Sequence, residues 1–432
     1  MTLNIAVIVT LLLTLMGSGV YIGLAMAGVG VVALHFMRHL GSAVGAVLYN
    51  AVDSYPMAAI PLFLFLGQLV LHSGLSGRLY EGVSKFTRII PGGLLHSNIL
   101  SCAIFAAVSG SSTATAATIG TVAYREQKER GYKPSIITGS LAAGGTLGIL
   151  IPPSINMILY GAFVGASVGR LFAGGIVPGI ILASMFMIYI GFANWANRSL
   201  GPPPERLTRD YFPNAITALK DIFPMFLIIV VIMGSIYGGI MTPTEAAAAS
   251  AFLGIILGAA FGKMNFTVLK DSAVEALRAT AMCMLLYIGG NILGSAMGLL
   301  RLPAQLAEVI GGLGLTPMWI WFIIVIFYLI LGCFMDALSM MLVTLAVTYP
   351  LIFTFAGFDP IWFGVQLVIL AEIGAVTPPV GLNLFIIQGV SNVDLWTIIR
   401  GVFPFFLLML AILALCTFFP ELVLFLPAHM LG

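Results

Sequence analysis

Residues 144–156 read GGTLGILIPPSIN and residues 371–383 read AEIGAVTPPVGLN, two apolar stretches that each contain a proline pair. The pairs begin at Pro152 and Pro378, which are 226 residues apart. A proline pair removes backbone donors and breaks a helix, and the carbonyl groups that it frees cannot be left facing lipid. Two such breaks at matching positions predict an internal repeat with two discontinuous helices.

The composition excludes a soluble protein. The chain has 432 residues, of which 60% are hydrophobic and 8% are charged, and its mean hydropathy is +1.11. A soluble domain is about a quarter charged, whereas an apolar stretch of about 20 residues crosses a bilayer as a helix. The net charge of +2 offers no basis for binding nucleic acid. We therefore predict an all-α polytopic membrane protein with ten crossings, near 3–18, 20–37, 56–73, 135–164, 173–193, 222–239, 243–262, 279–298, 361–390 and 402–420.

A polar interruption lies about 40 residues before each proline pair. The first reads SGSSTATAATIG at 109–120, and the second reads GCFMDALSMM at 332–341. The apolar segments that contain them, 89–124 and 309–358, do not fit as simple crossings. We expect each to form a re-entrant hairpin that enters and leaves the membrane on one side.

The basic residues predict the orientation, because lysine and arginine concentrate in cytoplasmic loops. The densest cluster, from Arg125 to Lys133, fixes its loop as cytoplasmic, and counting outward places fifteen basic residues inside and three outside. Both termini then lie outside, and the two hairpins open to opposite sides of the membrane. If the first two spans, 3–18 and 20–37, instead formed one long helix, the amino terminus would lie inside. The inside residues are Arg78, Lys85, Arg88, Arg125, Lys128, Arg130, Lys133, Arg198, Arg206, Arg209, Lys220, Lys263, Lys270, Arg278 and Arg400, and the outside residues are Arg38, Arg170 and Arg301.

The chain thus divides into two inverted repeats. The first covers 1–200, with a scaffold at 1–55 and transport elements at 56–200. The second covers 201–432, with a scaffold at 212–265 and transport elements at 279–432. Inverted repeats with discontinuous helices at matching positions are typical of secondary transporters, whose binding site lies near the membrane midplane.

Oxygen-rich residues at the predicted hairpin tips and helix breaks suit a hard cation, which prefers hydroxyl, carbonyl and carboxylate ligands. We expect Na⁺ rather than protons as the coupling ion, because the first group contains no ionisable side chain. The alternative is that these small and hydroxylic residues only pack helices closely. The candidate Na⁺ ligands are Ser109, Gly110, Ser111, Ser112, Gly144, Gly145 and Thr146 in the first repeat, and Gly332, Cys333, Asp336, Gly374 and Thr377 in the second.

Four further polar residues are candidates for contact with substrate, namely Arg301, Asn156, Asn383 and Glu372. An ionisable residue within apolar sequence, such as Asp336 or Glu372, is a functional hypothesis by default. Arg301 would meet an anionic substrate, or would only extend to the interface from a helix end. Asn156 and Asn383 each follow a proline pair and would either donate to substrate or cap the restarted helix.

Together the stretches SGSSTATAATIG, LGILIPPSINMILYG, MTPTEAAAASA, GCFMDALSMM and IGAVTPPVGLNLFIIQG resemble the large membrane subunit of tripartite ATP-independent periplasmic (TRAP) transporters, DctM type. The resemblance covers roughly 55–400. It implies an elevator-type transporter of the ion-transporter superfamily in the bacterial inner membrane, driven by Na⁺ and importing carboxylate solutes. It also implies two partners, a small four-helix membrane subunit (DctQ type) and a periplasmic substrate-binding protein (DctP type).

The substrate and the mode of working stay open at this point. Among the organic acids that the resemblance implies, we lean to a sugar acid such as N-acetylneuraminate, with a C4-dicarboxylate as the alternative. A stand-alone Na⁺/carboxylate symporter or antiporter, and a channel, are the rival functions. An enzyme is not expected, because the sequence contains no clustered catalytic set. The only Gly-Lys pair, Gly262-Lys263, lacks the P-loop pattern, so the sequence offers no sign of a nucleotide-driven transporter. The four cysteines lie within apolar sequence and are expected to pack as small core residues.

Overall fold

A computed structural model describes residues 2–37, 40–205, 211–312 and 314–430, and within these ranges the chain is helical without a β-strand. The first half contains α1 (Thr2–Gly17), α2 (Ile22–Val32), α3 (Ala43–Val52), α4 (Ala59–His72), α5 (Leu75–Thr87), α6 (Leu94–Ser109), α7 (Ser112–Glu129), α8 (Pro134–Leu150), α9 (Ile155–Val164) and α10 (Val168–Ala196). The second half contains α11 (Tyr211–Tyr237), α12 (Pro243–Phe261), α13 (Phe266–Leu299), α14 (Leu302–Gly312), α15 (Pro317–Gly332), α16 (Ala337–Pro350), α17 (Pro360–Ala375), α18 (Leu382–Ser391), α19 (Leu395–Phe418) and α20 (Glu421–Met430).

The helices confirm a multi-pass membrane protein. In the described part of the chain, seven helical segments are long and apolar enough to cross a bilayer. They are Tyr55–His72, Pro134–Val164, Val168–Ala196, Ala215–Tyr237, Pro243–Phe261, Phe266–Leu299 and Leu395–Phe418. The other three predicted crossings correspond to the shorter α1, to α2 with the π-helical turn Ala33–Met37, and to the α17–α18 pair.

Some helices differ from the predicted spans. Helix α13 has 34 residues rather than the 20 of 279–298, because Asn265 starts it early by accepting a hydrogen bond from the Val268 backbone N–H at 2.8 Å. The early turns of α13 carry four charged residues, which hydropathy alone excludes from a span. The short helices α3, α5, α14 and α20 also fall outside the predicted crossings.

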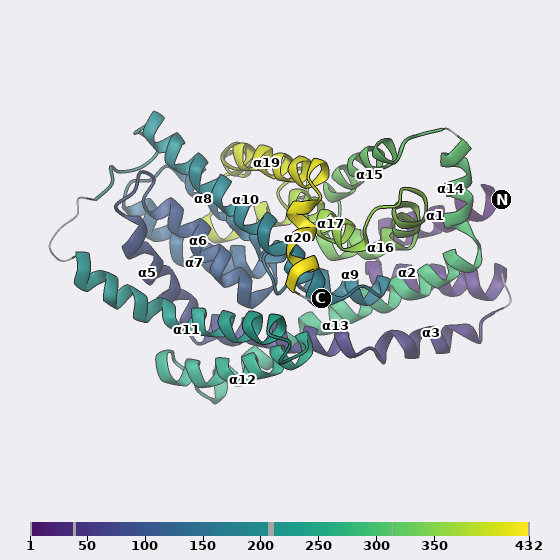
Figure 1. Cartoon of the computed structure of the whole chain (residues 1–432), viewed down its shortest axis with the longest axis horizontal. Coiled ribbons are helices and arrows are strands. Elements are labelled where there is room, and N and C mark those ends of the chain that lie inside the picture. Colours follow the sequence, from purple (N-terminus) through teal and green to yellow (C-terminus); the bar gives the residue numbers. More distant parts are fainter. Residues whose placement is uncertain (1, 38–39, 206–210, 313, 431–432) are drawn as a thin grey trace.

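The two re-entrant hairpins are present and enter from opposite ends of the molecule. Helices α6 and α7 form hairpin 1, and α15 and α16 form hairpin 2. Figure 1 shows hairpin 1 towards the left end and hairpin 2 towards the right end, with their tips directed to the centre. Each proline pair divides a broken helix, α8–α9 in the first half and α17–α18 in the second. This inverted arrangement confirms the predicted fold.

The repeats are interlocked. Helix α18 of the second half packs against α7 and α8 of the first, whereas α9 of the first half packs against α16 and α17. The Tyr160 hydroxyl of α9 donates to the Pro360 carbonyl at the start of α17, at 2.7 Å. Each broken helix therefore ends beside the hairpin of the other repeat.

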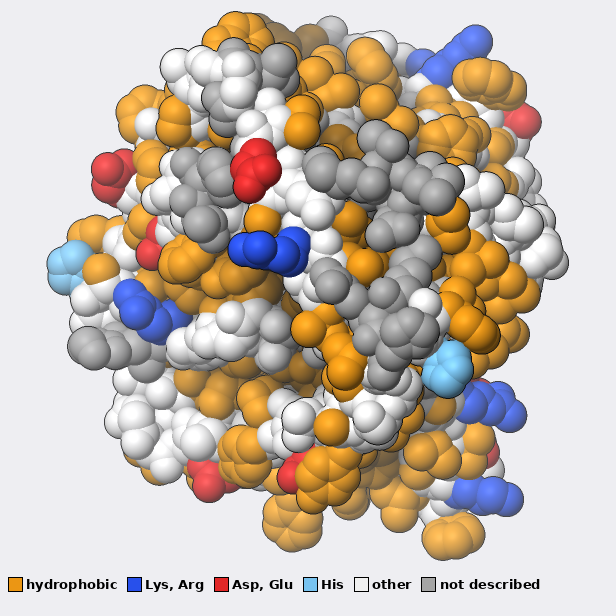
Figure 2. All heavy atoms as spheres, turned by 90° about the vertical axis from the view of Figure 1, so that its right-hand side faces the viewer, with side chains coloured by type: hydrophobic (Ala, Val, Ile, Leu, Met, Phe, Trp, Pro, Cys, Tyr) orange, Lys and Arg blue, Asp and Glu red, His pale blue; other side chains and the backbone are white. Residues whose placement is uncertain are grey.

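Helices α11, α12, α13 and α3 lie along the lower side in Figure 1, and the hairpins and broken helices lie above them. The predicted scaffold segments 1–55 and 212–265 include α3, α11 and α12; the division into scaffold and transport elements stays a prediction. The end of the molecule that bears α14 shows only scattered charged side chains among apolar ones (Figure 2). Of the basic residues used for orientation, Arg38, Arg206 and Arg209 lie outside the described residues.

Glycines allow α2 to pack directly on α13. A Cβ atom added at Gly23 of α2 would lie 2.7 Å from the Leu285 carbonyl oxygen, and one added at Gly289 of α13 would collide with the Gly23 carbonyl oxygen. Small residues at a helix contact let two backbones approach closely. This contact joins the amino-terminal helices to the longest helix of the second half.

We predict that Gly23→Ala lowers the midpoint temperature of thermal unfolding in detergent. Overpacking at a close contact costs about 1–3 kcal/mol. The matched control is Gly298→Ala in α13, where an added Cβ atom meets nothing within 4 Å, so that its midpoint should stay equal or rise. Equal midpoints for Gly23→Ala and the unmodified protein would contradict the close contact.

Candidate functional site

The tip of hairpin 1 is a left-handed turn followed by a capped helix. Gly110 has a φ of +62°, a conformation that glycine adopts at little cost. Ser111 caps α7, since its Oγ accepts from the Ala114 backbone N–H at 3.4 Å. The Ser109 hydroxyl lies 3.1 Å from the Thr115 hydroxyl, behind the tip. The tip thus presents neutral hydroxyl and carbonyl oxygens.

Hairpin 1 rests against the break in its own repeat. The Ile155 backbone N–H, at the start of α9, donates to the Gly110 carbonyl at 3.4 Å. A Cβ atom at Gly148 would lie 2.5 Å from the Ser111 carbonyl oxygen, and one at Gly145 would lie 2.6 Å from the Ala116 Cβ. Only glycine permits this approach of α8 to the tip.

The tip of hairpin 2 repeats this arrangement with a carboxylate. The Asp336 Oδ2 atom accepts from the Leu338 and Ser339 backbone N–H groups, both at 3.1 Å, and so caps α16. The Cys333 carbonyl accepts from the Val380 backbone N–H within the second break, at 3.1 Å. Behind the tip, a Cβ atom at either Gly332 or Gly374 would lie 2.8 Å from the Cα of the other.

The two tips meet at a cavity of about 220 Å³. Six predicted site residues line it, namely Gly110, Ser111, Ser112, Asn156, Asp336 and Asn383. Among the described residues that line the cavity, Asp336 is the one carboxylate, and none is lysine or arginine.

The first residues of four helices line this cavity: Ser112 of α7, Ile155 of α9, Ala337 of α16 and Leu382 of α18. The amino-terminal end of a helix carries about half a positive charge and free backbone donors. Four such ends around one cavity make it attractive to an anion without a basic side chain.

The two asparagines that follow the proline pairs reach the cavity with unused polar atoms. The Asn383 Nδ2 donates to the Ser112 hydroxyl at 2.7 Å and thereby joins α18 to hairpin 1. The Asn383 Oδ1 and the Asn156 Nδ2 are buried and have no hydrogen-bond partner among the described residues. An acceptor and a donor are thus available to a ligand.

The other predicted cation ligands do not line the cavity. Ser109, Gly144, Gly145 and Thr146 lie where hairpin 1 packs on α8, and Gly332, Cys333, Gly374 and Thr377 lie where hairpin 2 packs on the second break. The Thr146 hydroxyl donates to the Ala143 carbonyl at 2.7 Å, and the Thr377 hydroxyl donates to the Ile373 carbonyl at 2.5 Å. Both hydroxyl groups retain lone pairs that a cation could use.

Arg301 and Glu372 do not line the cavity. Arg301 follows α13 in a left-handed conformation, with φ +56°, and its backbone N–H donates to the Gly298 carbonyl. It lies 18 residues beyond Cys283, or about 27 Å along the helix at 1.5 Å per residue. Glu372 is fully buried in α17. Both of its carboxylate oxygens are buried without a hydrogen-bond partner among the described residues.

Helix α13 supplies a wall of the cavity that the sequence did not predict. Ala279, Met282 and Cys283 line the cavity from this helix, and Leu64 lines it from α4. The sequence placed Cys283 in the core, and it is 5% exposed. No local pattern distinguishes a small core residue from one beside a narrow cavity, so this wall had no signal in the sequence.

The comparison with protein families decides what kind of transporter this is. Residues 7–422 match the model of the tripartite ATP-independent periplasmic transporter, DctM component. The chain belongs to this family. As a TRAP large permease, it is a transporter and not an enzyme.

Several relatives align along most of this chain. It is 36% identical to the isethionate TRAP transporter permease protein DctMQ of Oleidesulfovibrio alaskensis, over 92% of this chain and 63% of that relative. It is 34% identical to the C4-dicarboxylate large permease DctM of Pseudomonas aeruginosa, over 88% of each chain. It is 29% identical to the sialic acid large permease SiaM of Vibrio cholerae, over 89% of each chain.

A solved structure supports the fold. The YdaH transporter of Alcanivorax borkumensis superposes with a TM-score of 0.61 and 13% sequence identity, covering 92% of this DctM chain and 90% of that chain. At this identity the likeness concerns the fold alone.

We predict that Asn383→Ala and Ser112→Ala each lower the initial uptake rate, and that the double variant loses less than the sum of the two losses. Contacting residues show coupling energies of about 0.5–3 kcal/mol. The control is Asn291→Ala, because Asn291 donates within α13 to the Tyr287 carbonyl at 2.8 Å and does not line the cavity. Strictly additive losses would show that the bridge between α18 and hairpin 1 does not matter to transport.

Proposed function

We propose that this chain is the translocating subunit of a Na⁺-coupled importer of organic acids in a bacterial inner membrane. It would work with a small DctQ-type membrane subunit and a DctP-type periplasmic binding protein. The observation that carries this proposal is the cavity between the two hairpin tips, lined by four helix amino-terminal ends and by unused asparagine atoms.

The helix ends support an anionic substrate. They offer partial positive charge and backbone donors, whereas no described residue that lines the cavity is basic. The names of the three relatives indicate isethionate, C4-dicarboxylates and sialic acid, all of them acids. A carboxylate or sulfonate group beside the helix ends, with its polar substituents at Asn156 and Asn383, accounts for both observations.

The size of the cavity favours a small acid. Sites for drug-sized ligands enclose roughly 300–1,000 Å³, whereas this cavity encloses about 220 Å³. We therefore favour a C4-dicarboxylate or a smaller acid over a sugar acid such as N-acetylneuraminate. This revises the lean drawn from the sequence alone.

Asp336 supports coupling to a cation. Its carboxylate lines the same cavity that would receive the anionic substrate, and two like charges in a low-dielectric site repel strongly. A Na⁺ ion at the tip of hairpin 2 would neutralise Asp336 and so favour the anion. At hairpin 1 the proposed ligands are neutral oxygens of Ser109–Ser112 and Gly144–Thr146. At hairpin 2 they are oxygens of Gly332, Cys333, Asp336, Gly374 and Thr377.

The interlocked repeats support an elevator motion. Because α18 is bound to hairpin 1 and α9 packs on α16, the hairpins and broken helices would move as one unit. That unit would slide against the scaffold of each half and against the small subunit. The excess of basic residues in the predicted cytoplasmic loops supports termini on the periplasmic side.

We predict that Asp336→Asn retains the fold but weakens the Na⁺ dependence of uptake. Asparagine caps a helix about as well as aspartate, so the variant removes the negative charge but keeps the cap of α16. The Na⁺ concentration for half-maximal uptake should rise at least tenfold, which corresponds to about 1.4 kcal/mol.

Asp359→Asn is the matched control. The Asp359 Oδ1 caps α17 by accepting from the Ile361 and Trp362 backbone N–H groups at 2.7 and 3.2 Å, and Asp359 does not line the cavity. Its Na⁺ dependence should equal that of the unmodified protein. If both variants respond alike, Asp336 acts only as a cap.

Uptake into proteoliposomes tests the whole proposal. Labelled succinate, isethionate and N-acetylneuraminate are offered while a Na⁺ gradient, the small subunit and the binding protein are added in turn. We expect uptake of a small acid only when all three are present. Uptake by the chain alone would indicate a stand-alone symporter, and uptake without Na⁺ would remove the proposed coupling ion.

A further inference from the structure

Glu372 is a buried carboxyl group that the proposed substrate cavity does not use. No N–H or O–H group of the described residues donates to either of its carboxylate oxygens. An ionised carboxylate can only accept hydrogen bonds, and an unpartnered charge inside a protein is very costly. Glu372 also lies in the last turn of α17, at the negative end of the helix dipole. A positively charged partner would relieve both costs.

No buried basic side chain of the surrounding helices is that partner. Helices α8, α9, α10, α15, α16, α18, α19 and α20 pack against α17. Within these described helices the charged and histidine side chains are all exposed, whereas Glu372 is fully buried. They are Arg170, Arg400, Glu421 and His429.

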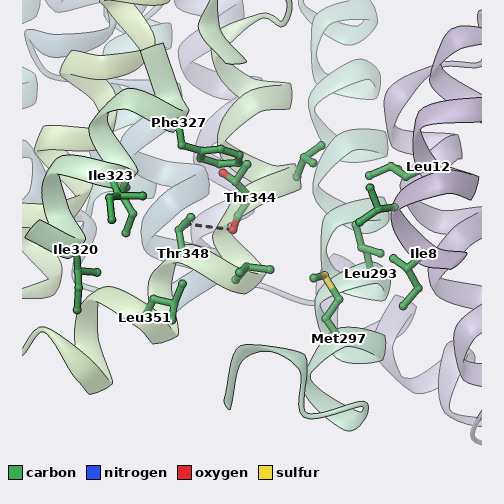
Figure 3. Close-up of a pocket in the computed structure, with 14 residues that line it drawn as sticks. Ile8, Leu12, Leu293, Met297, Ile320, Ile323, Phe327, Thr344, Thr348 and Leu351 are labelled. Atoms are coloured by element: carbon green, nitrogen blue, oxygen red, sulfur yellow. Dashed lines mark hydrogen bonds between the residues drawn. The ribbon is translucent and has the colours of Figure 1, made fainter. Parts of the chain in front are cut away.

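The tyrosine hydroxyls of α9 and α15 are bound elsewhere. The Tyr160 hydroxyl donates to the Pro360 carbonyl. The Tyr328 hydroxyl is hydrogen-bonded to the Thr344 and Thr348 hydroxyls of α16. Figure 3 shows these two threonines side by side, with the Thr348 hydroxyl donating to the Thr344 carbonyl at 3.1 Å (dashed line). The hydroxyls of these two tyrosines are therefore not available to Glu372.

Glu372 points away from hairpin 2 and towards α10. Gly374 faces hairpin 2, because a Cβ atom there would lie 2.8 Å from the Gly332 Cα, and residues two apart on a helix point to opposite sides. Val365 lies seven residues, or about two turns, before Glu372 and so shares its side of α17. The Val365 Cγ2 atom would lie 3.1 Å from a Cβ atom at Gly174 of α10.

Two backbone carbonyl groups without helical donors meet at this part of α10. Pro178 has no N–H, so the Gly174 carbonyl lacks the donor four residues on. Leu150 is the last residue of α8, and the final carbonyl groups of a helix have no donor within it. A Cβ atom at Gly175 would lie 2.6 Å from the Leu150 carbonyl oxygen. Carbonyl and carboxylate oxygens are the ligands that hard cations prefer.

The internal repeat also relates Glu372 to a proposed cation ligand. The proline pairs are 226 residues apart, and the same offset relates Thr146 of α8 to Glu372. Thr146 is fully buried as well, and its hydroxyl is among the oxygens proposed to hold Na⁺ in the first repeat. A neutral oxygen and a carboxyl group thus occupy equivalent places in the two halves.

We propose that the Glu372 carboxylate binds one Na⁺ ion together with the Leu150 and Gly174 carbonyl oxygens, where α17 and α8 meet α10. The inference rests on the proposed function, because that function supplies Na⁺ as the cation. The site is separate from the tip of hairpin 2, since Glu372 and Gly374 point to opposite sides of α17. It assigns Glu372 to the cation and not to the substrate.

Binding of ²²Na⁺ to the full chain in detergent tests the site without substrate, partners or transport. The pH and the ionic strength are held constant, and bound ions are counted per chain at saturation. We expect Glu372→Gln to bind one Na⁺ fewer than the unmodified protein. Glu372→Thr copies the first repeat and is the second variant, for which we expect the same loss.

Glu421→Gln is the matched control. Glu421 is exposed on α20, which also packs against α17, so its variant should bind as many ions as the unmodified protein. Asp336→Asn should lose a different ion, and the double variant with Glu372→Gln should lose two. Loss of a single ion in the double variant would show that the two carboxylates share one site and would overturn the proposal.

Equal binding by Glu372→Gln and the unmodified protein would also overturn the proposal, because Glu372 would then be a neutral acid. In that case the Na⁺-coupled importer would stand and this inference alone would fall. Absence of Na⁺ binding by the unmodified chain would remove the coupling ion of the proposed function as well. Uptake that does not depend on Na⁺, with the Glu372 ion still bound, would overturn the coupling but not this site.

Discussion

A backbone break at the depth of a membrane must find protein partners, because lipid offers none. In this chain the partners of each break come from a hairpin. The Ile155 backbone N–H reaches the Gly110 carbonyl, and the Val380 backbone N–H reaches the Cys333 carbonyl. Each hairpin tip also interrupts a helix, so its free carbonyl group requires a donor from the break, just as the break requires an acceptor from the tip. Hairpins and broken helices are therefore a single structural requirement.

The glycines and the cavity follow from that requirement. A hairpin tip meets a broken helix closely only where side chains are absent, as at Gly148 and at the Gly332–Gly374 contact. A break restarts a helix beside the cavity, and a hairpin starts its returning helix there as well. In this chain the two breaks and the two hairpins bring four helix amino-terminal ends to one cavity. The attraction for an anion is thus a by-product of the way in which the backbone is satisfied.

The sequence predicted those features that have a local cause. Proline pairs, polar interruptions and apolar length lie within short windows, and they correctly placed both hairpins and both broken helices. Helix α13 begins before the predicted crossing 279–298, because Asn265 caps a helix whose first turns are charged and therefore do not register as apolar sequence. The hydrogen bond between Asn383 and Ser112 joins residues 271 positions apart, and no local pattern encodes such a partner. For the same reason Ala279 and Cys283 could not be assigned to the cavity, and Arg301 and Glu372 could not be separated from it.

The two repeats have the same backbone arrangement, but only the second has a charged residue at its hairpin tip. At the tip of hairpin 1 a helix is capped by neutral Ser111, whereas at the tip of hairpin 2 it is capped by the Asp336 carboxylate. Under the proposed mechanism, a cation at the first tip is held by dipoles alone, and a cation at the second tip also cancels a full charge. Cancelling that charge is the change that an anion in the shared cavity responds to most strongly. The binding of cation and anion is then coupled mainly through hairpin 2, the less buried of the two hairpins.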